Sequence, residues 1–441
     1  MKITDIKATD ISLPFQTCMF EMPYGATMGV SKTIVEVYTD EGVVGLGDAW
    51  FDPSEEKPER FQQVKKRIVG ESPFNLNVIR RKIRDTYFWG GIPHGAYAAI
   101  DQACWDIMGK ATGKPVYELL GGKSRDRIPF SGYVQTPRYK GPMDVGGEQS
   151  PEAVVKLAEH MIDEFGFKVL KFKVGIYPWR QDVEIIRLMR DTFGEDVGLR
   201  VDPQDSWTPQ QALYACKRLE RYNLEYVEDP IDRNDLYNLS LLRRQIKTPL
   251  ATDGTQFSAN PRLFVINAKF DPPAFDIILS SPHYYGGISG ARNLAAVCDT
   301  LGLGLSMHVA SGDFGIATAA VLHIAASQPN MLYACDTTWG STHHPDQDYT
   351  TEDTRFKIED GCIKVPDKPG LGIELDEDRV KRYHEIFERE GGMTFHFGDP
   401  FKPGWWPTVG EQRWLEFPVD EERYETWLKV SKERGYTVEK F

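Results

Sequence analysis

One strand–helix–strand unit is complete in residues 169–202, VLKFKVGIYPWRQDVEIIRLMRDTFGEDVGLRVD. Its two ends are short apolar runs of the kind found in buried strands, and the segment between them is amphipathic with helical spacing. Apolar runs of the same kind recur along the chain, at 128–135, 224–229, 249–253, 275–280, 303–308 and 332–336. Eight strands that alternate with helices predict an α/β fold built on a (β/α) barrel of the TIM type.

Two of the intervening helices have clear starting signals. Ser150 and Thr208 each stand directly before a proline, so a capping hydroxyl precedes a residue suited to the first helical turn. We therefore expect helices to begin at these two positions and to return the chain to the next strand.

The segments outside the barrel have a different pattern. Alternating polar and apolar residues predict three early strands, at 2–14, 31–40 and 43–49. A helix with apolar residues at spacings of three and four follows, at 94–112. Beyond the barrel strands we expect a hairpin at 356–365 and a helix from Asp376 to about Glu390. These patterns divide the chain into an α+β domain, the barrel and a C-terminal segment, at 1–125, 126–370 and 371–441.

Composition excludes some classes of partner. The 441 residues carry a formal net charge of -13, which argues against binding to nucleic acid or to an anionic membrane surface. No apolar run is long enough to span a bilayer, and the first residues alternate like a strand, unlike a signal peptide. The six cysteines are scattered without metal-ligand spacing. We expect a reduced, cytoplasmic protein.

Polar side chains occur where the predicted barrel strands end, which is where barrel enzymes place their catalytic groups. Lys171 and Lys173 share one face of their strand because they are two residues apart. The later strand ends follow Lys173 at steps of 25 to 29 residues, with Asp202, Glu228, Asp253, Ser281, His308 and Asp336.

Each of these residues also has a structural explanation. Paired lysines usually lie on a solvated face, and an aspartate at a strand end often caps the next helix. A single histidine at a strand end is more often structural than catalytic. Three acids on consecutive strand ends, opposite two lysines, are much less readily explained in this way.

The three acids define the predicted chemistry. Carboxylate oxygens from neighbouring strands form a hard site that suits Mg²⁺, and no cysteine or histidine pair favours zinc. Such an ion stabilises the anion that forms when a proton leaves the carbon next to a substrate carboxylate. A lysine near another cation and the metal should have its pKa lowered and could serve as the base.

Several motifs resemble those of the enolase superfamily, namely LKFK (170–173), VDPQDSW (201–207), YVEDP (226–230) and the histidine at position 308. Others resemble the glucarate dehydratase branch, namely PLATD (249–253), SPHYY (281–285), YACDTTW (333–339) and VPDKPGLGIELD (365–376). The resemblance implies a modified barrel with an α+β capping domain, formed by the N-terminal part together with the C-terminal segment.

The resemblance also implies roles for individual residues. Mg²⁺ would be held by Asp202, Glu228 and Asp253. Lys173 would be the base and Lys171 its partner at the substrate carboxylate, with His308 as the acid or base on the opposite face. The expected substrate-binding residues are Tyr24, Ser281, His283, Asp336 and Thr338.

Three positions depart from the branch pattern. Asp253 stands where the branch has asparagine, although aspartate is also a good ligand for Mg²⁺. Ser281 replaces the aspartate that orients the histidine, and Thr338 replaces a histidine. A histidine without its orienting partner should be a poorer base.

The leading hypothesis is a dehydratase of acid sugars that removes the α-proton and the β-hydroxyl to give a 2-keto-3-deoxy acid. An epimerase or racemase of a carboxylate substrate is the main alternative, and it requires a base on each face of the substrate. A cycloisomerase usually has a lysine at the position of His308. A relative that binds an acid without catalysis has no need of Lys171 and Lys173. We also expect a homo-oligomer.

Overall fold

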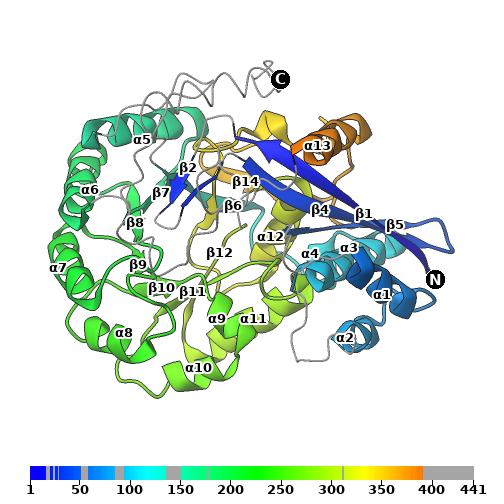
Figure 1. Cartoon of the computed structure of the whole chain (residues 1–441), viewed down its shortest axis with the longest axis horizontal. Coiled ribbons are helices and arrows are strands. Elements are labelled where there is room, and N and C mark those ends of the chain that lie inside the picture. Colours follow the sequence, from blue (N-terminus) through cyan, green and yellow to red (C-terminus); the bar gives the residue numbers. More distant parts are fainter. Residues whose placement is uncertain are drawn as a thin grey trace.

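The computed structural model describes residues 1–15, 20–22, 25–27, 29–50, 58–84, 94–135, 150–175, 178–309 and 312–390. A curved parallel sheet, surrounded by helices, occupies one side of the molecule, and a small antiparallel sheet with its own helices occupies the other (Figure 1). Tyr24 and the tail 391–441 lie outside the described residues.

Eight parallel strands form the barrel in the order β12-β11-β10-β9-β8-β7-β6-β13. The two ends of this order meet at isolated bridges, between His308 and Asp336 and between Leu305 and Met331. The strands lie at the predicted apolar runs: β6 Arg127–Val134, β7 Val169–Lys173, β8 Gly198–Asp202, β9 Tyr226–Glu228, β10 Leu250–Thr252, β11 Ile277–Ser280, β12 Gly304–Met307 and β13 Cys335–Thr337.

Helices connect the barrel strands and cover the outside of the sheet (Figure 1). Ser150 caps α5 by accepting a hydrogen bond from Ala153 N–H, and Thr208 forms a capping box with Gln211 at the start of α7. Both predicted helix starts are therefore confirmed. The outer helices are α5 Pro151–Phe165, α6 Trp179–Phe193, α7 Pro209–Leu219, α8 Leu236–Arg243, α9 Thr255–Ala259, α10 Arg262–Asn267, α11 Gly287–Leu301 and α12 Gly315–Ser327. A 3₁₀ turn, η1 Glu220–Tyr222, follows α7.

The cap is an antiparallel sheet packed on helices. Its strands β1 Ile3–Pro14, β4 Gly29–Thr39 and β5 Val44–Trp50 are adjacent in that order, and β2 Phe20–Met22 pairs separately with β3 Gly25–Thr27. The helices of this part are α1 Pro58–Ile68, α2 Leu76–Arg84, α3 His94–Thr112 and the short α4 Val116–Leu119. Helix α3 lies so close to β5 that a Cβ atom on Gly47 would be 1.8 Å from the carbonyl oxygen of Ala99. Glycine is required at this crossing.

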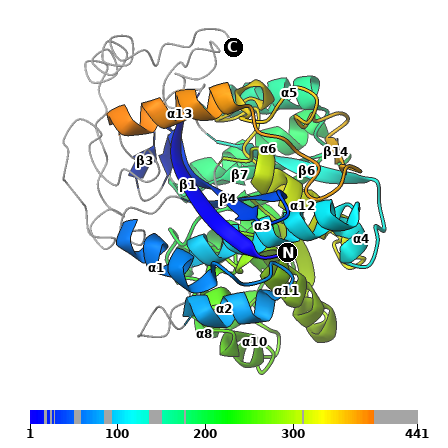
Figure 2. The same cartoon turned by 90° about the vertical axis from the view of Figure 1, so that its right-hand side faces the viewer.

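The described C-terminal part returns to the cap. Helix α13, Glu377–Glu390, lies beside β1 (Figure 2), and the ring of His384 is 2.7 Å from the carbonyl oxygen of Asp10. The hairpin expected at 356–365 is reduced to one antiparallel bridge, in which Glu359 and Cys362 exchange backbone hydrogen bonds of 2.9 and 3.0 Å. The strand β14, Cys362–Lys364, pairs antiparallel with β6 instead of with the residues before the turn. A 3₁₀ turn, η2 Pro345–Gln347, precedes it.

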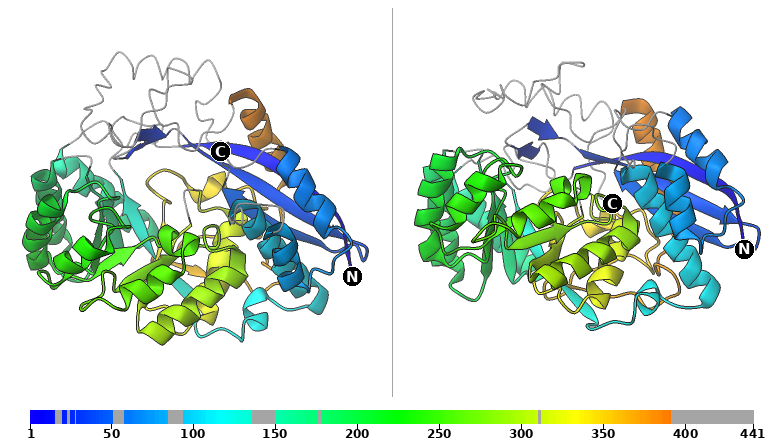
Figure 3. Two further views of the ribbon diagram at one scale, coloured as in Figure 1. Left: turned by 60° about the horizontal axis from the view of Figure 1, so that its bottom comes forward. Right: turned by 90° about the horizontal axis from the view of Figure 1, so that it is seen from below.

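The cap lies beside the barrel along one flank (Figure 3). Helix α3 joins the two, since Trp105 Nε1 donates to Ser289 Oγ of α11 at 2.9 Å. Among the described residues, no helix is both long and apolar enough to cross a membrane.

Candidate functional site

Side chains that meet inside the barrel come in pairs two residues apart, because such residues share a face of a strand. The pairing of β7 with β8 sets Lys171 beside Arg200 and Lys173 beside Asp202. Arg200 is in turn in register with Tyr226 of β9. The register therefore creates a deep layer of side chains around Lys171 and a second layer, nearer the strand ends, around Lys173.

Asp336 of β13 is the centre of the deep layer. Its carboxylate lies 2.8 Å from Lys171 Nζ and 2.9 Å from Arg200 Nη1, and it accepts hydrogen bonds from Ser131 Oγ at 2.5 Å and Tyr133 Oη at 3.3 Å. Burial opposes ionisation of Asp336, but Lys171 and Arg200 outweigh burial and hold its pKa below the usual value. Asp336 is fully buried, and its contacts connect β13 to β6, β7 and β8.

Lys171 is held as a cation. Burial alone would lower its pKa, yet the charges of Asp336 and Glu228 raise it well above the ordinary value. Its Nζ is ion-paired with both carboxylates. A buried, permanently charged ammonium suits the attraction of an anionic substrate group better than proton abstraction.

The three predicted metal ligands lie at the ends of adjacent strands, each paired with a cation of the chain. Asp202 contacts Lys173, and Glu228 contacts Lys171. Asp253 contacts Arg233. Among the described residues, no three histidine, cysteine, aspartate or glutamate side chains are close enough to hold one ion together.

The donor set nevertheless fits Mg²⁺ in its chemistry. All three groups are carboxylates, and burial, followed by the charge of Asp202, raises the pKa of Glu228. The repulsion between these two carboxylates is what a divalent cation relieves. Asp253 accepts three hydrogen bonds or ion-pair contacts, from Thr255 N–H and Oγ at 3.0 Å each and from Arg233, and an ionised carboxylate has about four acceptor positions.

His308 follows β12, on the other side of the barrel from the lysines. Its backbone N–H donates to Ser280 O at 2.8 Å, and its ring lies 5.7 Å from the ring of Tyr284. Within the described part of the chain, Nε2 has no hydrogen-bond partner. Burial lowers the pKa of His308 to about 4, so its imidazole is neutral at neutral pH.

The expected substrate-binding residues have partners within the protein. Ser281 Oγ accepts a hydrogen bond from His283 N–H at 3.2 Å. His283 Nε2 lies 2.9 Å from Asp48 Oδ1 of the cap. The hydroxyl of Thr338 donates to Asp313 Oδ2 at 3.0 Å. All three residues are buried.

Sequence reasoning missed residues that support the site. Arg200 is fully buried and also lies 2.6 Å from Glu225. It stands two residues before Asp202, so the periodicity that linked the two lysines could have identified it. The partners Arg233 and Asp48 gave no comparable signal, because their contacts depend on how loops and domains meet.

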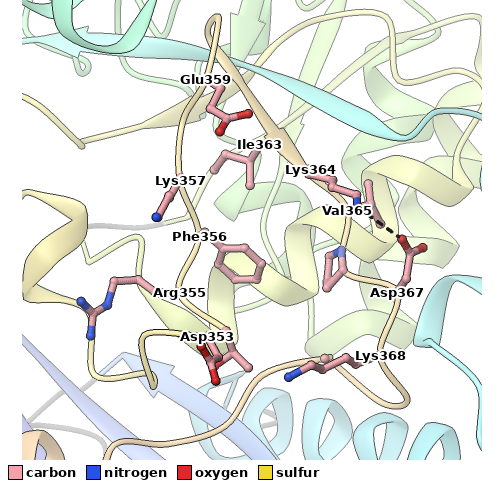
Figure 4. Close-up of a pocket in the computed structure, with 13 residues that line it drawn as sticks. Asp353, Arg355, Phe356, Lys357, Glu359, Ile363, Lys364, Val365, Asp367 and Lys368 are labelled. Carbon is pink, nitrogen blue, oxygen red and sulfur yellow. Dashed lines mark ion pairs between the residues drawn. The ribbon is translucent and has the colours of Figure 1, made fainter.

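One described pocket lies away from this constellation. It has a volume of about 500 Å³ and is lined by residues 353–357, 359, 363–368 and 372, beside the pairing of β14 with the first half of β6. Figure 4 shows Phe356 near its centre, while the charged ends of Arg355, Lys357 and Lys368 lie apart from one another. Charged groups that are spread in this way do not form a convergent site, and the strand ends remain the candidate.

Comparison with known proteins connects this geometry to a family. The family of enolase C-terminal domain-like proteins matches residues 153–379, and that of the mandelate racemase / muconate lactonizing enzyme N-terminal domain matches residues 6–121. The chain is 30% identical to a "probable glucarate dehydratase" of Streptomyces coelicolor, over 87% of this chain and 92% of the relative. It is 28% identical to an N-succinyl-L-Arg/Lys racemase of Bacillus cereus, over 86% and 97% respectively. A crystal structure of an enolase from Thermobispora bispora with magnesium and formate superposes with a TM-score of 0.79, at 31% identity, over 88% of this chain and 94% of that one.

Proposed function

The chain belongs to the enolase superfamily, in its glucarate dehydratase-like branch, and we propose that it is a magnesium-dependent dehydratase of acid sugars. The observation that carries the proposal is the position of Lys173 beside Asp202, on the strand next to it, with His308 on the opposite side of the barrel. This arrangement supplies a proton acceptor and a proton donor to the two faces of a carboxylate substrate. We propose cytoplasmic location as well.

In the proposed reaction, Lys173 Nζ takes the proton from the carbon next to the substrate carboxylate. Lys171, held as a cation by Asp336, attracts that carboxylate and fixes its orientation. A magnesium ion held by Asp202, Glu228 and Asp253 would supply positive charge that stabilises the resulting anion.

His308 then donates a proton to the departing β-hydroxyl, which leaves as water. Its pKa of about 4 means that the imidazole starts neutral, so a bound anionic substrate must first raise that pKa by favouring the charged form. The ring packs against that of Tyr284, and within the described part of the chain no carboxylate accepts a hydrogen bond from its Nε2.

A racemase or epimerase is the second candidate, and the neutral state of His308 favours it. A neutral imidazole is already a base, so the site offers a nitrogen base on each face of the substrate. The racemase of Bacillus cereus is 28% identical to this chain, over 86% of this chain's length.

The test is exchange of the α-proton in D₂O. A panel of acid sugars is first screened for dehydration with Mg²⁺, and the best substrate is then followed by NMR. We expect Lys173→Ala to reduce exchange by about 10²–10⁴-fold, and His308→Asn to stop dehydration while some exchange remains. Lys168→Ala, which changes an exposed lysine just before β7, is the matched control and should leave both rates unchanged.

Two outcomes would contradict the proposal. If His308→Asn abolishes exchange and Lys173→Ala does not, the two residues have the opposite roles. Recovery of substrate with inverted configuration, without loss of water, would identify the racemase instead.

A further inference from the structure

Arg233 connects the three loops that carry the proposed metal ligands. It follows β9, and its backbone N–H donates to Asp205 Oδ1 at 2.9 Å, while its Nε donates to Asp205 Oδ2 at 2.8 Å. Its Nη2 lies 3.3 Å from Asp229 Oδ2, and its Nη1 pairs with Asp253. One guanidinium therefore contacts three carboxylates, and these follow the ends of β8, β9 and β10 respectively.

Each of these carboxylates is close in sequence to a ligand position or occupies one. Asp205 lies three residues after Asp202, Asp229 directly follows Glu228, and Asp253 is itself the third proposed ligand. The loops are also joined directly, since Asp253 N–H donates to Asp229 Oδ2 at 3.2 Å and Asp205 N–H donates to Asp229 O at 2.8 Å. Movement of Arg233 would therefore remove one side-chain contact from each of the three loops at once.

The backbone at these strand ends needs such support. Gln204, Asp205 and Asp229 have positive φ angles, of 51°, 62° and 38°, although none is glycine. Conformations of this kind cost on the order of 1–3 kcal/mol each and persist only where surrounding contacts enforce them. The bidentate contact of Arg233 with Asp205 and its pairing with Asp229 can do so. They act together with the hydrogen bonds from Asp205 N–H to Asp229 O and from Gln204 N–H to Asp202 Oδ1.

Arg233 also balances the negative charge of Asp253. A carboxylate at the third ligand position adds one negative charge to a site that already contains Asp202 and Glu228. Arg233, with a side chain 17% exposed, is the cation that faces this added charge. Because the contact uses Asp253 Oδ2 and Thr255 holds Oδ1, the carboxylate is fixed in orientation.

We propose that Arg233 is a positioning residue for the metal site, which holds Asp253 and the loops after β8 and β9 in the geometry that binds Mg²⁺. The inference rests on the proposed function, because it assumes that these carboxylates bind the ion. The planar guanidinium group of Arg233 is essential to this role, since a lysine at this position keeps the charge but cannot contact three carboxylates in fixed directions.

The experiment measures Mg²⁺ binding by isothermal titration calorimetry, in the full chain without substrate. Residues that support metal ligands typically change metal affinity by about 10–100-fold when altered, so we expect Arg233→Lys to raise the Kd at least about 10-fold and Arg233→Met to raise it further. Arg243, the last residue of α8, is the matched control, because its side chain is 20% exposed and its Nε lies 2.7 Å from Oδ2 of Asp276. Asp276 directly precedes β11, so this pair lies at the opposite end of the barrel strands from the proposed ligands. Arg243→Lys should bind Mg²⁺ like the wild type.

Circular dichroism spectra establish that each variant is folded. If Arg233→Met and Arg233→Lys do not fold, Asp205→Asn removes one contact of the guanidinium group, and we expect it to raise the Kd about two- to fivefold by the same reasoning. Unchanged or tighter Mg²⁺ binding in the folded variants overturns the inference while leaving the proposed function intact. A wild-type protein that binds no Mg²⁺ overturns both.

Discussion

Replacing Lys32 with methionine should lower the free energy of unfolding by about 3–5 kcal/mol, the cost of breaking a buried ion pair by removing one partner. Lys32 Nζ lies 2.7 Å from Asp48 Oδ2, and both side chains are fully buried in the cap. Asp48 also lies 2.9 Å from His283 Nε2, which belongs to the loop after β11 in the barrel. Burial opposes ionisation of Asp48, yet Lys32 and His283 outweigh it and lower its pKa to about 2.

The large expected loss follows from what remains after the substitution. Without Lys32, the carboxylate of Asp48 stays buried, and the side chains left to contact it in the described part of the chain are His283 and, at 3.4 Å, the hydroxyl of Tyr349. Methionine fills the volume but supplies no charge. Because Tyr284, the neighbour of His283, packs against the ring of His308, the same substitution should also disturb the candidate site.

Urea unfolding followed by circular dichroism measures the effect. Lys7→Met is the matched control, because Lys7 also pairs with a cap residue, Glu36, at 3.3 Å, but is 57% exposed and should contribute below about 1 kcal/mol. We expect the effects of Lys32→Met and Asp48→Asn on the free energy of unfolding not to add. The double variant should lose at least about 1 kcal/mol less than the sum of the losses in the two single variants. If Lys32→Met loses no more than Lys7→Met, the reasoning about the buried pair is wrong.

Two further predictions concern pH and substrate. His323 accepts from Tyr117 N–H and contacts Leu371 O, each at 3.2 Å, and burial lowers its pKa to about 4 from 6.5. The unfolded chain therefore binds this proton first, so stability should fall as the pH drops from 6.5 to about 4, by at most about 1.4 kcal/mol per unit. Urea midpoints at pH 7 and 5 should show a smaller difference in His323→Gln. Second, because Thr338 is bonded to Asp313 where the branch has histidine, glucarate should be a poor substrate, and dehydration with a kcat/KM above about 10⁴ M⁻¹s⁻¹ would contradict this.

The barrel was predictable from sequence because its strands are buried on both sides. Such strands are nearly continuous apolar runs, and glycine, proline and capping residues separate them from the helices. The hairpin at 356–365 could not be judged in the same way. The partner of β14 is β6, more than 200 residues earlier, and a local pattern cannot distinguish that partner from an adjacent one.

The strand-end residues could also be predicted from the sequence, because the fold and the spacing place them together before any contact is known. The residues that support them were harder to predict. Arg200 follows from the two-residue period of β8, but the contacts of Arg233 depend on three loops with unusual backbone angles. Asp48 reaches His283 across the junction of cap and barrel, and no periodicity encodes that junction.

The candidate site therefore depends on three charge networks that serve different purposes. Asp336 fixes Lys171 deep in the barrel, Arg233 joins the loops that carry the carboxylates, and Asp48 connects the cap to the loop beside His308. The hydroxyl of Thr338 donates to Asp313, outside these networks, and that of Ser281 accepts from the backbone N–H of His283 and not from the ring that contacts Asp48. A chain built in this way can change the residues at the expected substrate-binding positions Ser281 and Thr338 while its lysines and carboxylates keep their places.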